Sequence, residues 1–169
     1  MSLINKEQEH QDQKAWSNNV QKLKGYKELV EKVEYWAELK NSLINPVIIG
    51  PYEIVFDNEL GWCVDIDGSV SFVDMGITEI PFQFRNVSGY FICSNTKLCS
   101  LKGCPKEVGT HFSCYNCSKL TSLEYCPKEV GDDFFCTYCG KKFTKEYVES
   151  LCDVKGDIYN GGDVYNGSN

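Results

Sequence analysis

The sequence has few of the side chains that enzymes commonly use for acid–base chemistry. Its 169 residues include two histidines, His10 and His111, and one arginine, Arg85. No nucleophile and base stand at a recognisable spacing, and glycine-rich phosphate loops are absent. We therefore expect a protein that is not an enzyme and that uses no cofactor.

Long apolar runs are also missing. Nowhere do eighteen apolar residues follow one another, so the sequence predicts no transmembrane helix and no membrane partner. The polar start, MSLINKEQEHQDQK, lacks the apolar core of a secretory signal. These two absences favour a cytoplasmic protein.

Positive charge is in deficit, because 17 basic residues face 24 acidic ones and the formal net charge is −7. Such a surface repels phosphate backbones, which makes nucleic acid an unfavourable partner and a basic protein a better one. Most of the surplus lies between residues 44 and 100. A solvated acidic surface that keeps the protein in solution explains it, and mimicry of nucleic acid is the alternative.

An internal repeat organises the chain. Residues 97–117, KLCSLKGCPKEVGTHFSCYNC, match residues 119–139, KLTSLEYCPKEVGDDFFCTYC, at a shift of 22 residues. This period and the apolar spacing are typical of leucine-rich repeats, in which a short strand, a turn and a return segment recur. Fainter copies predict five strands, which start near Ser69, Tyr90, His111, Asp133 and Asp157.

We therefore predict an α/β solenoid, a short leucine-rich-repeat horseshoe with an N-terminal helical cap. The cap, residues 1–45, is one long amphipathic helix or two broken near Gly25. Residues 46–160 hold a β-hairpin and about five repeats, and 161–169 form a flexible tail. The apolar stripe of the cap is expected to pack on the first repeat, and consists of Trp16, Val20, Leu23, Val30, Val33 and Ala37.

The repeat unit SLxGCPKEVGxxFxC resembles the leucine-rich-repeat proteins of tailed bacteriophages, over roughly Trp62 to Asn160. The resemblance implies a phage origin and a small curved solenoid. By analogy with other small accessory phage proteins, it implies an inhibitor of a host defence protein or host enzyme, acting in the bacterial cytoplasm.

The role of the ten cysteines can be interpreted in two ways. The spacing of Cys114-x-x-Cys117 and Cys136-x-x-Cys139 is typical of a four-thiolate zinc site. Each of these cysteines also falls on a column of the repeat, where cysteine serves as a small core residue. We favour the structural role. The alternative is a zinc-stabilised module that binds nucleic acid or protein.

Alternation along each predicted strand directs one set of side chains outward. Large groups dominate that outward set, and strand propensity alone is the plainer explanation for them. Rigid aromatic rings are frequent interface anchors, so we predict a concave face that binds a host protein of unknown identity. The long helix and the open solenoid ends would also allow a homodimer. The predicted protein-binding residues are Tyr90, Ile92, His111, Tyr115, Phe135, Tyr138 and Tyr159.

Overall fold

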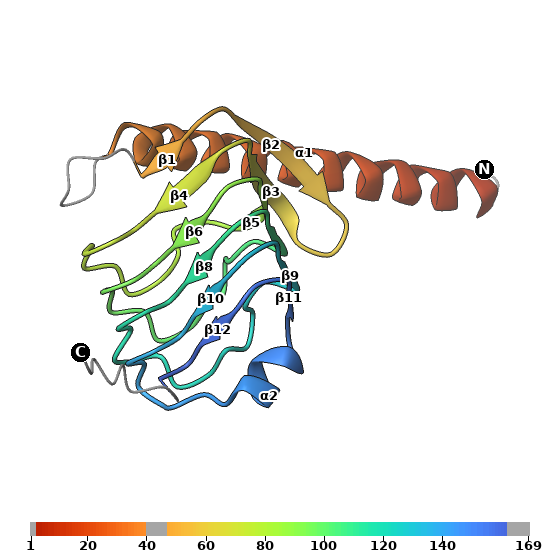
Figure 1. Ribbon diagram of the computed structural model, residues 1–169. Coiled ribbons are helices and arrows are strands. Elements are labelled where there is room, and N and C mark those ends of the chain that lie inside the picture. Colours follow the sequence, from red (N-terminus) through yellow and green to blue (C-terminus); the bar gives the residue numbers. More distant parts are fainter. Residues whose placement is uncertain (1–2, 40–46, 162–169) are drawn as a thin grey trace, which may run out of the picture.

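The computed structural model describes the backbone of residues 3–39 and 47–161, and the side chains from residue 18 onward within these ranges. The chain forms a β-solenoid with one long N-terminal helix lying across its first coil (Figure 1). The predicted cap boundary at residue 45 and the tail from residue 162 lie outside the described residues. No helix in the described part of the chain has the length and apolarity needed to cross a membrane.

Two six-stranded sheets build the solenoid, and each coil contributes one strand to each sheet. The first sheet contains, in spatial order, β1 (Ile48–Ile49), β4 (Ser69–Ser71), β6 (Phe91–Ile92), β8 (Phe112–Ser113), β10 (Phe134–Phe135) and β12 (Ile158–Tyr159). The second sheet contains β11 (Asp153–Val154), β9 (Glu129–Val130), β7 (Glu107–Val108), β5 (Phe84–Val87), β3 (Gly61–Ile66) and β2 (Tyr52–Asp57). Strands of successive coils pair in parallel, whereas β1 with β4 and β2 with β3 pair antiparallel.

The first sheet confirms the five predicted strands, which are β4, β6, β8, β10 and β12. Their inward residues stack in register, with Phe91 beside Phe112 and Phe112 beside Phe134. These three phenylalanines are fully buried, and the rings of Phe112 and Phe134 lie 4.9 Å apart. The solenoid itself is thus predictable from the repeat.

Strands β2 and β3 of the second sheet form the predicted β-hairpin. The other strands of this sheet occupy segments that the leucine-rich-repeat interpretation assigned to a return path without strands. In each of the two clear repeats, a Glu-Val pair forms a two-residue strand, and Val108 stacks on Val130 inside the core. The structure is therefore a β-solenoid with two sheets, in each of which successive coils pair in parallel. The last return segment contains a short helix, α2 (Lys145–Glu149), whose N-cap residue is Thr144.

Glycine marks the corner between the two sheets. A Cβ on Gly109 would lie 2.0 Å from the carbonyl oxygen of Ser88, and a Cβ on Gly131 would lie 2.1 Å from that of Gly109. Both backbone N–H groups donate hydrogen bonds of 2.8 Å to the preceding coil. Stacking at this corner therefore requires a residue without a side chain.

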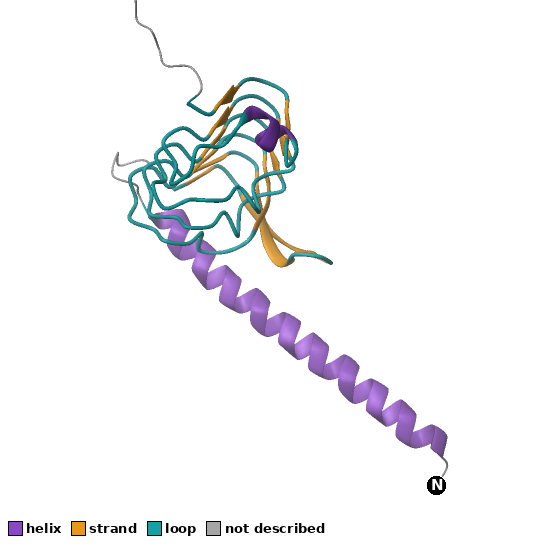
Figure 2. Cartoon of the chain, turned by 90° about the horizontal axis from the view of Figure 1, so that it is seen from below, coloured by secondary structure: helices purple, strands orange, loops and turns teal. Residues whose placement is uncertain are grey.

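Helix α1 (Leu3–Glu38) is a single unbroken helix that extends beyond the solenoid at its N-terminal end (Figure 2). Of the predicted stripe, Val33 is buried against the first coil and Val30 and Ala37 are half-buried, whereas Val20 and Leu23 are exposed by 45% and 55%. Leu29, which the prediction did not include, is buried as well. The apolar stripe is therefore covered only in its C-terminal part. The side chain of Trp16 lies outside the described residues.

Gly25 has a packing role in α1. The β2–β3 hairpin crosses the helix there, and a Cβ on Gly25 would stand 3.1 Å from the indole of Trp62. That indole N–H donates a 2.6 Å hydrogen bond to the backbone carbonyl of Lys22. The helix runs through Gly25 without a break, so the single long helix is the correct one of the two predicted alternatives, and the missing side chain leaves room for Trp62.

Candidate functional site

The seven predicted binding residues lie on or next to the strands of the first sheet. Ile92, Phe135 and Tyr159 share one outward column with Ser113, since their strands pair in register. Tyr90 and His111 precede β6 and β8, while Tyr115 and Tyr138 follow β8 and β10. We call these seven residues the aromatic face, defined as Tyr90, Ile92, His111, Tyr115, Phe135, Tyr138 and Tyr159.

Neighbouring coils of the aromatic face contact each other through their rings. Phe135 and Tyr159 stack with centroids 4.6 Å apart and planes 5° from parallel. His111 meets Phe135 edge-on at 6.2 Å, and Tyr115 meets Tyr138 edge-on at 5.5 Å. Each ring thereby restrains its neighbour and has little side-chain entropy left to lose on binding.

Exposure differs across this surface. Tyr115, Tyr138 and Tyr159 are exposed, and the other four members of the aromatic face are half-buried. Three serines expected to point outward are buried instead. Ser113, for example, stands in register between Ile92 and Phe135, and its hydroxyl lies 2.7 Å from that of Ser94. Larger side chains on the neighbouring strands cover these short ones. The three buried serines are Ser71, Ser94 and Ser113.

Among the side chains that the structure describes, Tyr138 is the most exposed large apolar one, at 69%. Its backbone φ is +58°, a left-handed conformation that bulky residues rarely adopt. The equivalent positions of earlier coils hold Asn95 and Asn116, residue types that tolerate this conformation. A strained, solvent-exposed tyrosine at an asparagine position is difficult to explain by folding alone.

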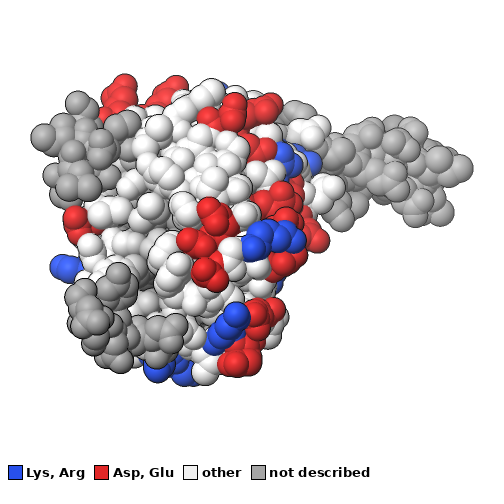
Figure 3. All heavy atoms as spheres, viewed as in Figure 1, with Lys and Arg blue, Asp and Glu red and all other residues white. Residues whose placement is uncertain are grey.

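Charge is unevenly distributed around this surface (Figure 3). The surface over the first sheet is largely uncharged, and acidic side chains gather toward its border with the second sheet. On the second sheet, Arg85 pairs with Asp65, while Lys106 lies 2.9 Å from Glu59. The aromatic face is therefore an uncharged area with an acidic border.

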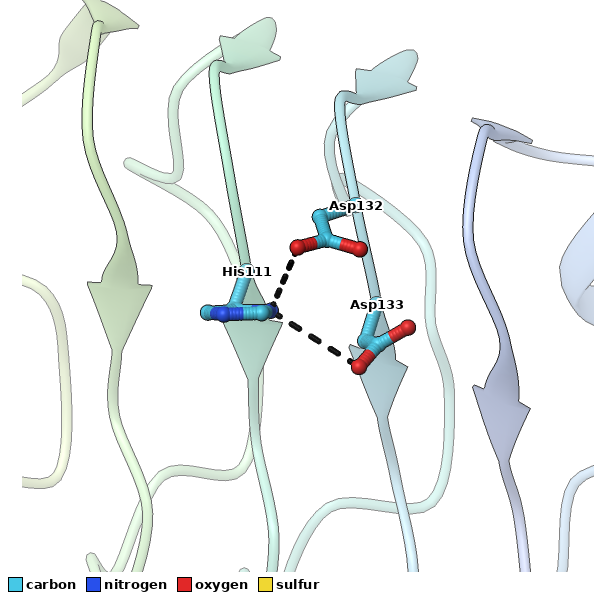
Figure 4. A group of neighbouring side chains, drawn as sticks. All are labelled: His111, Asp132 and Asp133. Carbon is cyan, nitrogen blue, oxygen red and sulfur yellow. Dashed lines mark ion pairs between the residues drawn. The ribbon is translucent and has the colours of Figure 1, made fainter.

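One group of polar side chains interrupts the aromatic face. His111 Nδ1 lies 3.6 Å from a carboxylate oxygen of Asp132 and 3.9 Å from one of Asp133 (Figure 4). In the described part of the chain, this is the only group of three or more His, Cys, Asp or Glu side chains whose ligand atoms lie within 4.8 Å of one another. This group of side chains was not predicted from the sequence. The 22-residue shift places Thr110-His111 over Asp132-Asp133, and that alignment was the available signal.

The cysteines of the proposed zinc alternative lie inside the coils. The Cys117 thiol donates to the carbonyl oxygen of Cys93 at 3.1 Å, and the Cys139 thiol makes the equivalent bond of 3.2 Å to Cys114. These repeated contacts tie the turn of one coil to the strand of the previous one. The four-cysteine zinc site stays a prediction from spacing alone, and comprises Cys114, Cys117, Cys136 and Cys139.

Burial also makes several thiols poor nucleophiles. Removal from water raises the pKa of Cys126 to about 11 and the pKa values of Cys136 and Cys152 to about 12. Since the thiolate is the reactive form, these cysteines behave as small core residues. Cys99 is exposed, and the other described cysteines are buried or half-buried.

No family model, curated protein or solved structure matches the chain. The fold places the chain in the class of β-solenoids, and the evidence for its function lies on its own surface.

Proposed function

We propose that this chain is a non-catalytic binding module that holds a protein partner on its aromatic face. The observation that carries the proposal is Tyr138, whose ring is 69% exposed on a backbone that disfavours a bulky side chain. Its contact with Tyr115 extends the ring surface across two coils. Aromatic groups held in this way are typical anchors of protein interfaces.

The scaffold favours recognition of a folded surface. Strand β10 pairs in parallel with both β8 and β12, so the stacked rings of Phe135 and Tyr159 project from hydrogen-bonded strands. Rigid rings bury a large area at small entropic cost. The acidic border adds attraction for a partner with basic groups around an apolar centre.

The proposal also covers the origin of the protein and the source of its partner. The repeat motif supports a relationship to bacteriophage leucine-rich-repeat proteins, and a partner from the bacterial host follows from that relationship. In this hypothesis the module inhibits a host defence protein or enzyme by covering part of its surface.

A pull-down with paired variants tests the proposal. The tagged protein is incubated with bacterial lysate, and stoichiometric retained proteins are identified by mass spectrometry. The test variant replaces Tyr115 and Phe135 by alanine. The control replaces Tyr52 and Tyr147, two exposed tyrosines outside the aromatic face, by alanine. Circular dichroism verifies that both variants are folded.

The proposal predicts a partner that the wild type and the control variant retain and that the Tyr115/Phe135 variant loses. Removal of two central anchors should weaken binding by at least about 2 kcal/mol, or roughly 30-fold. Equal retention by the folded Tyr115/Phe135 variant would reject the aromatic face as the binding surface. Absence of any stoichiometric protein partner would reject the binding-module proposal.

A further inference from the structure

We propose that His111, Asp132 and Asp133 form a binding site for a divalent transition-metal ion of the zinc type, with one imidazole nitrogen and two carboxylate oxygens as ligands. The site is independent of the cysteine alternative, and it does not require the proposed protein partner. Its three residues come from two adjacent coils (Figure 4).

The distances fit a bound ion better than direct hydrogen bonds. Nδ1 of His111 lies 3.6 Å and 3.9 Å from the nearest oxygens of Asp132 and Asp133, too far for either to accept a hydrogen bond. A tetrahedral zinc ion with bonds of about 2.0–2.2 Å separates its ligand atoms by about 3.4 Å. Shifts of about 0.2 Å and 0.5 Å would bring the oxygens of Asp132 and Asp133 to this distance from Nδ1, and all three ligand atoms already lie within 4.8 Å of one another.

The His111 nitrogen supplies a separate observation. Although 43% of the side chain is exposed, Nδ1 itself is shielded from solvent and has no hydrogen-bond partner among the described residues. A shielded polar atom without a partner is costly, and a bound cation would satisfy it. Nδ1 faces the two carboxylates that would complete the coordination.

One of the two carboxylates is held in place. Oδ1 of Asp133 accepts a 2.9 Å hydrogen bond from the backbone N–H of Asp157, and Oδ2 is the atom that faces His111. Hydrogen bonds of this kind orient the ligands of metal sites.

The ligand chemistry selects the ion. Imidazole suits zinc, copper, nickel and iron, whereas calcium and magnesium prefer oxygen ligands alone. Three protein ligands leave a fourth position for water or for a side chain from another molecule. The ion would link the coil of β8 to the coil of β10 at the edge of the aromatic face that borders the second sheet.

Cobalt(II) titration of the full chain tests the site, with the thiols kept reduced by a phosphine. The absorption spectrum distinguishes nitrogen and oxygen ligands from thiolates, which add intense charge-transfer bands. The test variants are His111→Ala, His111→Gln and Asp133→Asn. Asp157→Asn is the matched control, because it removes the same charge one coil away and leaves the three ligands intact.

We expect one cobalt ion per chain without thiolate charge-transfer bands. Loss of one ligand should weaken binding by more than about tenfold, as loss of even an orienting group commonly does, whereas Asp157→Asn should retain most of the affinity. Zinc should compete for the site and raise the melting temperature of the wild type. Absence of cobalt binding, thiolate bands, or equal weakening by Asp157→Asn would each overturn the proposal. His111→Gln keeps the test decisive if His111→Ala does not fold.

Discussion

The side-chain amide of Asn116 donates a 2.9 Å hydrogen bond to the side-chain oxygen of Asn95, which holds the same position one coil earlier. Asn95 donates a similar bond of 2.7 Å to Asp74. These residues have φ values between +55° and +58°, and Tyr138 continues the column at +58°. A left-handed turn thus recurs in each coil, and a side-chain ladder links the turns until Tyr138 ends it.

Replacement of Tyr138 by asparagine should stabilise the fold. Asparagine tolerates the left-handed backbone and can extend the ladder from Asn116, so we expect a gain of about 1 kcal/mol in the free energy of unfolding. Urea denaturation measures it. The same variant should bind the proposed partner more weakly. A loss of stability would show that the Tyr138 ring contributes more to folding than to recognition.

Two substitutions of Asn116 separate the ladder from the backbone conformation. Glycine removes the side-chain hydrogen bond but adopts positive φ readily, whereas alanine removes the bond and strains the turn. Asn116→Ala should therefore be less stable than Asn116→Gly by about 1 kcal/mol. Thermal and urea unfolding of the pair provide the comparison. Equal stabilities would mean that the conformation of this turn contributes little.

Phe112 is expected to be essential for stability. Its ring is fully buried between those of Phe91 and Phe134, and truncation to alanine should cost about 3–5 kcal/mol. Phe135→Ala, which removes a half-buried ring from the next strand, serves as the matched comparison and should cost less. If denaturant unfolding ranked the two variants in the opposite order, the assignment of inward and outward sets would be wrong.

Thiol labelling should distinguish one cysteine from the rest. Cys99 is exposed, whereas burial raises the pKa of Cys126, Cys136 and Cys152. With iodoacetamide under native conditions, we expect Cys99 to react first, and the Cys99→Ser variant to react slowly until it is unfolded. Peptide mass spectrometry identifies the modified sites. Rapid labelling of Cys126 in the native protein would contradict the described burial.

The β2–β3 turn should contribute to acid sensitivity. Backbone N–H groups of Leu60 and Glu59 donate to Asp57 at 2.9 Å and 2.8 Å and lower the pKa of its carboxyl. A lowered folded pKa gives stability that is present above the unfolded value, near 3.8, and is lost as the pH falls through the folded value. Asp57→Asn should reduce the slope of stability against pH in this acidic range. An unchanged slope would assign the acid sensitivity to other groups.

The first sheet was predictable because each of its strands carries one large inward side chain that recurs with the repeat. Phe112 and Phe134 fix both the position and the register of their strands. In the second sheet only the hairpin strands β2 and β3 were predictable, since a two-residue strand such as Glu107–Val108 is too short to show alternation. Its pairing becomes evident only when the coils are stacked.

The sequence alone also could not reveal contacts between residues that belong to different elements of the fold. The sequence left open whether the helix breaks at Gly25, and it could not show that Trp62 packs against this residue. Alternation selected six of the seven residues of the aromatic face, and Tyr138 was added as the residue at its lower edge. The cluster around His111 required knowledge that Asp132 and Asp133 lie beside it in the next coil.

The near-identical coils also have an evolutionary consequence. Each clear repeat contains its own corner glycine, Gly109 or Gly131, and its own core phenylalanine, Phe112 or Phe134. Duplication of 22 residues by unequal crossing-over would therefore insert a coil that already fits both neighbours. A lineage could lengthen the recognition surface in single steps while conserving the hydrophobic interior, and adapt to a changing target without redesigning its scaffold.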